Sequence, residues 1–424
     1  MRLSTYPLVD AAEAAATVLE HTPVLGSEQL ALSECAGRVL AADLMATSPL
    51  PPHPSSAVDG FAVRAADAGR TLRIVGESAA GRPLAARVDE GTAARILTGG
   101  VVPDGADTVV MVEDVQLHSD SVTVPKGLAP GTNFHAVGAD LRQGERVLTA
   151  GMQLGAAEIG LAAALGRPRL EVHRRPKVAL MSTGDELVEV GTAPGPGQIP
   201  DSNRWALLAA LREAGAEVRL LGIAPDTAPE LRDLVTDALH DADVLVTSGG
   251  VSVGTHDLVK PLLETIGTVH IGRVKLKPGK PFTFATIGGQ ASPAARGRGR
   301  EGGGATVDQG RLAFGLPGFP VSSLVTFEVF VRPALRKMQG LAQLQRPSLP
   351  VRLAFNAKAV GDRTEYHRVT LRREGSDLVA DSTGSQSSSR LMSLAGAHAL
   401  VRVPPGDQGI SAGTTVEALI LALP

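Results

Sequence analysis

The stretch PKVALMSTG, residues 176–184, decides the fold class of this chain. It is a short apolar run closed by a Gly turn, which is typical of a buried strand. Helix-like and strand-like runs then alternate from residue 201 to residue 267 as DSNRWALLAALREAG, EVRLLGIA, TAPELRDLVTDALHD, ADVLVTSGG and HDLVKPLLETIG. Such alternation predicts βαβ units, so we expect residues 176–340 to form an α/β domain with a mostly parallel sheet between helices.

The flanking sequence predicts two further classes of structure. Residues 8–45 have apolar residues at helical spacing, and residues 151–168 return to that pattern. Short strand-like runs separated by Gly, Asp and Pro fill residues 58–145 and the C-terminal region. We therefore expect a discontinuous N-terminal helical/β domain (1–47 and 146–175), a β domain (48–145), the α/β domain, and a C-terminal β domain (347–424).

One segment of the α/β region has a different composition. Residues 288–311, GGQASPAARGRGREGGGATVDQGR, are Gly-rich and charged and show no periodicity. They cannot bury enough apolar surface to offset the entropy of ordering them. We predict a disordered insertion between two strands, TFATI and RLAFGLPG.

The composition limits the classes of partner. The 424 residues carry a formal net charge of −3 and 3% aromatic residues, so a broad nucleic-acid surface is not expected. The single cysteine, Cys35, allows no disulfide and is expected to be a small buried apolar residue. No signal peptide and no long apolar run are visible in the sequence, so the predicted location is the cytoplasm, without a membrane span.

Polar residues follow each of three predicted strands of the α/β sheet. The carboxyl ends of such strands are where open α/β sheets bind ligands. Glycines there let backbone N–H groups approach an anion, and carboxylates beside a phosphate require a divalent cation, most commonly Mg²⁺. The three strand ends carry STGDE (Ser182–Glu186), APD (Ala224–Asp226) and SGGVSVGTHD (Ser248–Asp257). The sequence therefore predicts a site for a nucleotide-like or phosphate-bearing ligand.

Each of these residues also has a purely structural interpretation. Asp226 or Thr227 has the spacing of a helix cap, and so has Asp257. Asp185 and Glu186 are equally compatible with solvated loop charges. Their joint placement at successive strand ends is what favours a binding site.

The segment VKLKPGKPF, residues 274–282, supplies positive charge. Lys277 and Lys280 flank a Pro-Gly turn, which we expect at the end of a further strand of the same layer. Ammonium groups there would neutralise an oxyanion. The alternative is a surface turn with solvated lysines. LPGFPVS, residues 316–322, then opens a helix with Ser322 in its first turn.

Nine motifs together resemble a known family over nearly the whole chain. They are SSAVDGFAVRAAD (55–67), RILTGGVVPDGAD (95–107), VGADLRQGERVL (137–148), RPKVALMSTGDEL (175–187), VTSGGVSVGTHD (246–257), VKLKPGKPF (274–282), GLPGFPVS (315–322), DRTEYHRVTL (362–371) and TGSQSSSRLMSLAGAHALVRVP (383–404). In order and spacing they resemble the molybdopterin molybdenumtransferases, to which the catalytic domain of gephyrin is similar.

The resemblance implies an activity and an architecture. The family converts adenylylated molybdopterin and molybdate into molybdenum cofactor and AMP with Mg²⁺ or a similar cation. It also implies an elongated homodimer whose active site is shared between the α/β domain and the partner's β domain. The C-terminal domain is then expected to be a β-barrel.

The resemblance also implies roles for particular residues. Thr183, Gly184, Asp185, Glu186, Ser248, Gly249, Gly250 and Ser252 would line the nucleotide and pterin phosphate site. Asp226 and Asp257 would be metal ligands, and Lys277, Lys280, Pro317, Ser322, Arg363 and Ser388 would lie at the molybdate site. Asp59, Thr98 and Asp140 would serve the partner's site, and Asp201 and Asn203 also match. Of these, Asp59, Asp140, Glu186 and Lys277 are the expected catalytic residues.

Several of these assignments have competitors. Asp59-Gly60 is also a common tight-hairpin pair, and Asp140 alone would pass as a turn carboxylate. The chain departs from the family at two positions, with Ala139 where Glu is usual and Phe319 where Asn is usual. A weakened paralogue acting as a scaffold is therefore an alternative function. A nucleotide pyrophosphatase is another, because the α/β segment also resembles that kind of enzyme.

Overall fold

The computed structural model describes residues 6–224, 227–250, 258–288, 310–359 and 361–423. The chain divides into two compact units, which are described separately. The first is formed by residues 1–28 and 173–424, and the second by residues 29–172. The predicted insertion, residues 288–311, lies largely outside the described residues.

A mixed sheet forms the centre of the first unit, in the order β16-β13-β17-β21-β20-β18. Its strands are β13 (Lys177–Ser182), β16 (Glu217–Ile223), β17 (Val244–Ser248), β18 (Gly267–Ile271), β20 (Thr283–Ile287) and β21 (Arg311–Leu316). The pairings from β16 through β21 are parallel, and β20 and β18 are antiparallel. The predicted α/β class with a mostly parallel sheet is confirmed.

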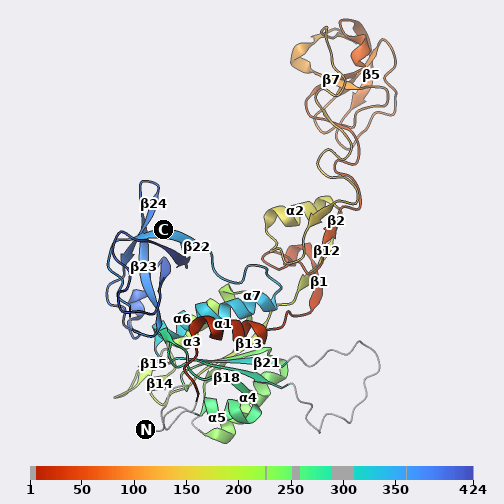
Figure 1. The fold of residues 1–424 in the computed structure, drawn as a ribbon. Helices are drawn as coiled ribbons and strands as arrows, with labels where there is room; N and C mark the ends of the chain where they lie inside the picture. The colour runs from red at the N-terminus through yellow and green to blue at the C-terminus, as the bar shows by residue number, and fades with distance from the viewer. Residues whose placement is uncertain (1–5, 225–226, 251–257, 289–309, 360, 424) are drawn as a thin grey trace, which may run out of the picture. The chain divides into compact units, whose positions relative to one another are not determined.

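Helices cover both faces of this sheet (Figure 1). On one face lie α1 (Ala11–Glu20), α3 (Asn203–Glu213) and the continuous segment α6 (Pro320–Thr326), π-helical η5 (Phe327–Val331) and α7 (Arg332–Met338). On the other lie α4 (Ala228–Asp241) and α5 (Val259–Ile266). Alternate residues of β13 enter the two cores, since Val178 and Leu180 face the first and Ala179 and Met181 the second. The sheet is thus buried on both sides, as its apolar strands require.

Helix α1 belongs to the α/β unit rather than to the N-terminal region that precedes the β domain. Its Ala14 and Val18 are buried in the same core as sheet residues. The domain boundaries proposed from sequence placed residues 1–47 together. The apolar face of α1 explains why the chain instead changes unit near residue 28.

The C-terminal region is a closed β-barrel. Its strands are β22 (Ser348–Leu353), β23 (Thr364–Glu374), β24 (Asp377–Ser382), β25 (Ala399–Val403) and β26 (Thr415–Ile420), with the short helix η6 (Leu391–Ser393). The order β23-β24-β22-β26-β25 closes through a second pairing of β23 with β25.

The short strand β19 (Leu276–Lys277) pairs with β23 of this barrel. The expectation that the lysine-rich turn ends a strand of the α/β layer is therefore wrong. The turn reaches across to the C-terminal domain instead.

The second unit consists mainly of β-structure. Its larger sheet runs β7-β4-β6-β5-β9-β8, with β4 (Gly60–Val63), β5 (Thr71–Ser78), β6 (Thr92–Ile96), β7 (Thr108–Met111), β8 (Gln116–Leu117) and β9 (Ser121–Thr123). Smaller pairs join β1 (Ser27–Ala31) to β12 (Arg169–His173), β2 (Leu44–Met45) to β11 (Arg146–Leu148), and β3 (Ser55–Ser56) to β10 (Phe134–His135). Short helices complete it: η1 (Leu32–Glu34), η2 (Ala65–Asp67), η3 (Val112–Asp114) and α2 (Ala156–Ala164).

The helical pattern expected over residues 8–45 forms a helix only in its first part, and residues 28–44 do not form one. Strand β1 and the 3-10 turn η1 occupy the first half of this latter stretch, because residues 27–31 pair with β12 and Gly37 adopts a positive φ of 72° that a helix cannot accommodate. Cys35 is fully buried, as expected. Within the described ranges, no helix is long and apolar enough to cross a membrane.

Candidate functional site

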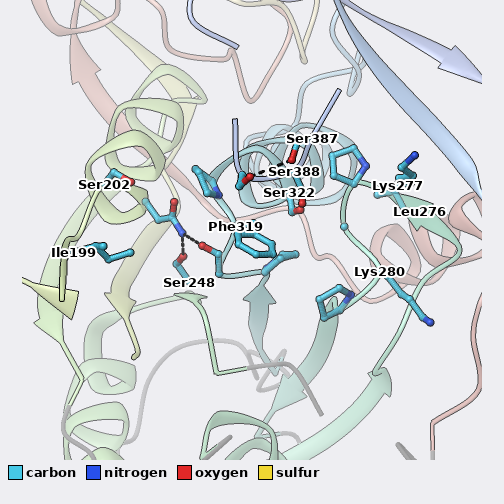
Figure 2. A pocket seen from close by; sticks show the side chains of 18 of the residues that line it. Ile199, Ser202, Ser248, Leu276, Lys277, Lys280, Phe319, Ser322, Ser387 and Ser388 are labelled. Atoms are coloured by element: carbon cyan, nitrogen blue, oxygen red, sulfur yellow. Dashed lines mark hydrogen bonds between the residues drawn. The ribbon is translucent and has the colours of Figure 1, made fainter. Parts of the chain in front are cut away.

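A cavity of about 1080 Å³ opens in the first unit, between the strand ends of the α/β sheet and the C-terminal barrel (Figure 2). Eleven of the residues predicted for the site line it: Thr183, Glu186, Asp201, Asn203, Ser248, Lys277, Lys280, Pro317, Ser322, Arg363 and Ser388. These residues come from segments up to two hundred positions apart in the sequence. The fold therefore brings together most of the site that the motifs predicted.

The wall formed by the strand ends is held by Asn203, at the start of α3. Its Nδ2 donates to Ser248 Oγ at 2.8 Å and to the Gly318 carbonyl at 2.6 Å, which fastens the ends of β17 and β21 to α3. Asn203 Oδ1 and Thr183 Oγ1 are buried and have no protein partner among the described residues. Such atoms are costly unless a ligand or water satisfies them, so they mark this wall as a polar binding surface.

Gly249 and Gly250 lie beside this wall in left-handed backbone conformations, with φ of 87° and 66°. A Cβ at Gly249 would collide with the Thr183 carbonyl, and one at Gly250 would lie 2.7 Å from Val259 Cγ2. Only glycine fits both positions, and the turn after β17 can therefore pack closely against the turn after β13. Gly184 belongs to the latter turn, with φ of 148°.

The acidic residues near the cavity have different environments. Asp201 is 1% exposed and is paired with Arg204, whose Nε lies 3.2 Å from Oδ2. The negative charge of Asp201 is therefore already paired with Arg204. Glu186 is exposed and lines the cavity, whereas Asp185 is exposed and is not among the lining residues. Asp185 thus fits its alternative interpretation as a solvated loop charge.

Three cationic residues line the opposite wall. Lys277 Nζ lies 3.1 Å from Oε1 of Glu365, which is buried. Burial opposes ionisation of Glu365, but His367 and Lys277 outweigh it and keep the pKa of that carboxyl below its ordinary value. Lys280 is exposed and Arg363 is half-buried. The wall therefore presents positive charge to the cavity, with a buried carboxylate behind Lys277.

The start of α6 and a serine-rich segment close the remaining side. Ser322 is buried in the first turn of α6, and the backbone N–H of Val321 donates to the Ser388 carbonyl at 3.2 Å. The ring of Phe319 is 59% exposed and lines the cavity, which keeps its volume of about 1080 Å³ with this ring in place. Figure 2 shows Ser387, Ser388 and Ser322 together beside the Phe319 ring.

Some lining residues were missed by the sequence interpretation. They are chiefly Ser385, Gln386, Ser387 and Ser389, the neighbours of Ser388. The run GSQSSS, residues 384–389, was a visible signal, since consecutive small hydroxyl residues next to a strand offer donors to an oxyanion. We call residues 385–389 the serine segment.

The other predicted residues are not part of this cavity. Asp226, Ser252 and Asp257 lie outside the described residues. Asp59, Thr98 and Asp140 belong to the second unit, where Asp140 is exposed in a turn. The predicted set therefore falls into a cavity group, the turn residues Gly184, Asp185, Gly249 and Gly250 of the first unit that are not in its lining, an undescribed group and a group in the second unit.

In the second unit, Asp59 and Thr98 form a local pair. The Asp59 carboxylate accepts hydrogen bonds from the backbone N–H of Thr98 at 2.7 Å and from its hydroxyl at 2.8 Å. These donors lower the pKa of Asp59. The tight-hairpin interpretation of Asp59-Gly60 is wrong, because β3 pairs with β10 while β4 pairs with β6 and β7.

The described residues do not by themselves supply a metal site. No cluster of three or more His, Cys, Asp or Glu side chains occurs within them that could hold an ion. Around the cavity, Asp201 is committed to Arg204, which leaves Glu186 as the accessible carboxylate. A bound Mg²⁺ would therefore need ligands from the undescribed strand ends, its own water and the substrate.

The comparisons with known proteins agree along the whole chain. Residues 9–166 match the model of the MoeA N-terminal region (domain I and II), residues 179–337 match a probable molybdopterin binding domain, and residues 350–421 match the MoeA C-terminal region (domain IV). The first and third matches are both regions of MoeA, and the molybdopterin-binding match lies between them in the sequence.

Full-length relatives extend the match. A molybdopterin molybdenumtransferase of Nostoc sp. is 37% identical, over 99% of this chain and 94% of that protein. Gephyrin of Dictyostelium discoideum is 35% identical over 99% of this chain, which spans 63% of gephyrin's length. The solved structure of a molybdopterin biosynthesis MoeA protein from Pyrococcus horikoshii superposes with a TM-score of 0.80 at 30% identity, over 98% of this chain and 99% of that one. The chain therefore belongs to the MoeA family of molybdopterin molybdenumtransferases.

Proposed function

We propose that this chain acts in molybdenum cofactor biosynthesis by inserting molybdate into adenylylated molybdopterin, with release of AMP. The observation that carries the proposal is the cavity of about 1080 Å³, which has a polar wall of strand ends on one side and cationic residues on the other. Its volume is sufficient for a nucleotide-sized ligand together with a small oxyanion. The family membership of the chain supports the same reaction.

The two halves of the cavity suit the two substrates. Thr183, Asn203 and Ser248 offer hydroxyl and amide groups to the phosphate-bearing pterin nucleotide, and two of these atoms have no partner within the part of the chain that the structure describes. Lys277, Lys280 and Arg363 offer ammonium and guanidinium groups to molybdate, which is a tetrahedral dianion. The serine segment supplies further hydroxyl donors.

The chemical difficulty is that two anions must come together. Cationic residues on one wall reduce this repulsion, and the shared cavity holds both reactants in reach of each other. In this proposal the protein acts by positioning and by charge neutralisation. Cys35 is buried in the second unit and does not line the cavity, so the proposed mechanism does not use its thiol as a nucleophile.

Mg²⁺ is the proposed cation, with Asp226 and Asp257 as its ligands. When bound, it would neutralise phosphate oxygens of the substrate. Asp226→Asn is expected to reduce AMP release at least tenfold at low Mg²⁺ and to be partly rescued at high Mg²⁺, since loss of a ligand weakens metal affinity. AMP release that does not change in this variant at any Mg²⁺ concentration rules out Asp226 as a ligand.

The decisive experiment follows AMP and molybdenum cofactor in the same reaction. Purified protein, Mg²⁺ and adenylylated molybdopterin are combined with and without molybdate. Molybdate-dependent release of AMP together with cofactor formation supports the proposal. AMP release from ordinary dinucleotides supports the pyrophosphatase alternative, and no release with any substrate supports a scaffold. The match of the flanking regions to the family is an observation against a stand-alone pyrophosphatase.

A further inference from the structure

Arg368 is a buried arginine behind the serine segment of the cavity. It lies on β23, it is fully buried, and it is the largest such side chain among the described residues. Burial lowers its pKa to about 10, with Glu365 acting in the opposite direction, so the guanidinium is charged at neutral pH. A buried charge is costly, and its contacts should explain why it is there.

All three guanidinium nitrogens of Arg368 donate hydrogen bonds within the barrel. Nη2 donates to the Ser387 carbonyl, Nε to Ser393 Oγ and Nη1 to the Tyr366 carbonyl, each at 3.2 Å. Two of these acceptors flank Arg390 in the sequence, since Ser387 belongs to the serine segment and Ser393 ends η6. The acceptors of the charged guanidinium are therefore two neutral carbonyls and a hydroxyl rather than a carboxylate.

The backbone of Arg368 holds the same segment a second time. Its N–H donates to Gln386 Oε1 at 2.8 Å, and its carbonyl accepts from Gln386 Nε2 at 3.1 Å and from Thr383 Oγ1 at 3.1 Å. The backbone and side chain of Arg368 thus hold residues 383, 386 and 387 through hydrogen bonds. The N–H of Val321, in the first turn of α6, holds the adjacent Ser388 carbonyl from the other side.

We propose that Arg368 is the positioning residue of the oxyanion end of the cavity, because it fastens the serine segment so that its hydroxyls line the space next to Lys277 and Arg363. This inference rests on the proposed function. The segment itself consists of small side chains, most of them exposed, and has little apolar surface with which to hold a conformation. The buried guanidinium also adds positive charge behind donors that face an anion.

Arg368→Lys is the principal test, because it keeps the charge and removes the planar fork that reaches several acceptors. We expect the KM for molybdate to rise about tenfold, because the variant loses one or two of the hydrogen bonds that hold the hydroxyl donors of the serine segment in place. The KM for adenylylated molybdopterin is expected to stay within about twofold, since Thr183, Asn203 and Ser248 are untouched. Arg373→Lys, an exposed arginine on the same strand, is the matched control and should change neither value.

Two further measurements keep the inference testable. Ser393→Ala removes the acceptor of Arg368 Nε together with the hydroxyl that donates to the Arg390 carbonyl, and it should shift the KM for molybdate in the same direction by a smaller factor. Calorimetric titration of sodium molybdate into each full-length variant with Mg²⁺ should show the same ranking of Kd. An equal rise in both KM values, or an Arg368→Lys variant that binds molybdate as the wild type does, overturns the inference. If the proposed function itself fails, the wild type releases no AMP, and the ranking of molybdate Kd still decides the role of Arg368.

Discussion

Lys277 Nζ and Glu365 Oε1 are 3.1 Å apart, and they are register partners in the parallel pairing of β19 with β23. One residue belongs to the α/β domain and the other to the barrel. Lys277 lines the cavity while the carboxylate is buried behind it, so a single ion pair connects the packing of the two domains with the cationic wall of the cavity.

Removing Lys277 is expected to affect stability as well as activity. Lys277→Met leaves Glu365 buried with His367 beside it but without the lysine ammonium. We expect this to cost about 1–2 kcal/mol, because the ammonium is partly exposed and the pair is partly screened. Lys280→Met removes an exposed ammonium from the same wall and should leave the thermal midpoint unchanged. Differential scanning fluorimetry of both variants compares them directly.

The double variant Lys277→Met/Glu365→Gln separates the two roles of Lys277. It removes the uncompensated buried charge and should recover most of the lost thermal midpoint. The molybdate-dependent activity should stay low, since the ammonium is still absent. Recovery of activity along with stability would show that Lys277 acts only in docking.

The homodimer with a shared site that the family resemblance implies would show complementation between two inactive variants. Asp59→Asn changes the second unit and Lys280→Ala changes the cavity, so each homodimer would have two defective sites. Random mixing would restore one intact site in each mixed dimer, about a quarter of wild-type activity per subunit. Co-refolded or co-expressed variants are assayed for AMP release. Activity no higher than the sum of the two separate variants would place both residues in one subunit's site or deny Asp59 a role.

Phe319 is expected to act on the pterin nucleotide rather than on the fold. Its ring is 59% exposed at the cavity wall, so Phe319→Asn should leave the thermal midpoint unchanged. Loss of an aromatic contact with a flat heterocycle should raise the KM for adenylylated molybdopterin about three- to tenfold. Steady-state kinetics with each substrate varied in turn measures this. A fall in that KM would mean that the ring obstructs the substrate.

His270 predicts how stability depends on pH. Burial first, and then the charge of His21, whose ring centroid lies 3.9 Å away, lower the pKa of His270. The folded state thus binds the proton less readily than the unfolded state, whose His has its ordinary pKa near 6.5. The stabilisation is complete above pH 6.5 and declines as the pH falls below that value. Thermal midpoints from pH 7.5 to 5.5 should fall, and they should fall less in His270→Gln. His53→Gln, at an exposed position, is the control.

The α/β domain was predictable because its signal is local. Apolar strands such as 178–182 and the glycine-ended helix at 203–213 each carry their own pattern, and parallel strands then bring Thr183 and Ser248 to one edge. The lysine-rich segment itself indicated Lys277, and the motif resemblance added Arg363 and Ser388 to the site, which no periodicity would have done.

What the sequence did not reveal depends on contacts between distant segments. Residues 28–44 have a helical pattern, but pairing with β12 decides their conformation. Likewise, Lys277 looks like the end of another strand of the α/β layer, and its true neighbour, Glu365, lies 88 positions further along the chain. The buried Arg368 showed no signal of its own, since an arginine in a strand pattern is ordinarily a solvated residue.

The β19–β23 pairing also has a consequence for biogenesis. The strand ends at Thr183 and Ser248 can be in place as soon as the α/β sheet has folded on the ribosome, but residues 363–389 are translated later. A nascent chain at that stage would have the proposed nucleotide-binding wall but not yet the residues of the oxyanion end. A chain truncated before β23 would then bind the nucleotide without converting it. In the proposed reaction, activity therefore requires translation of the last strands.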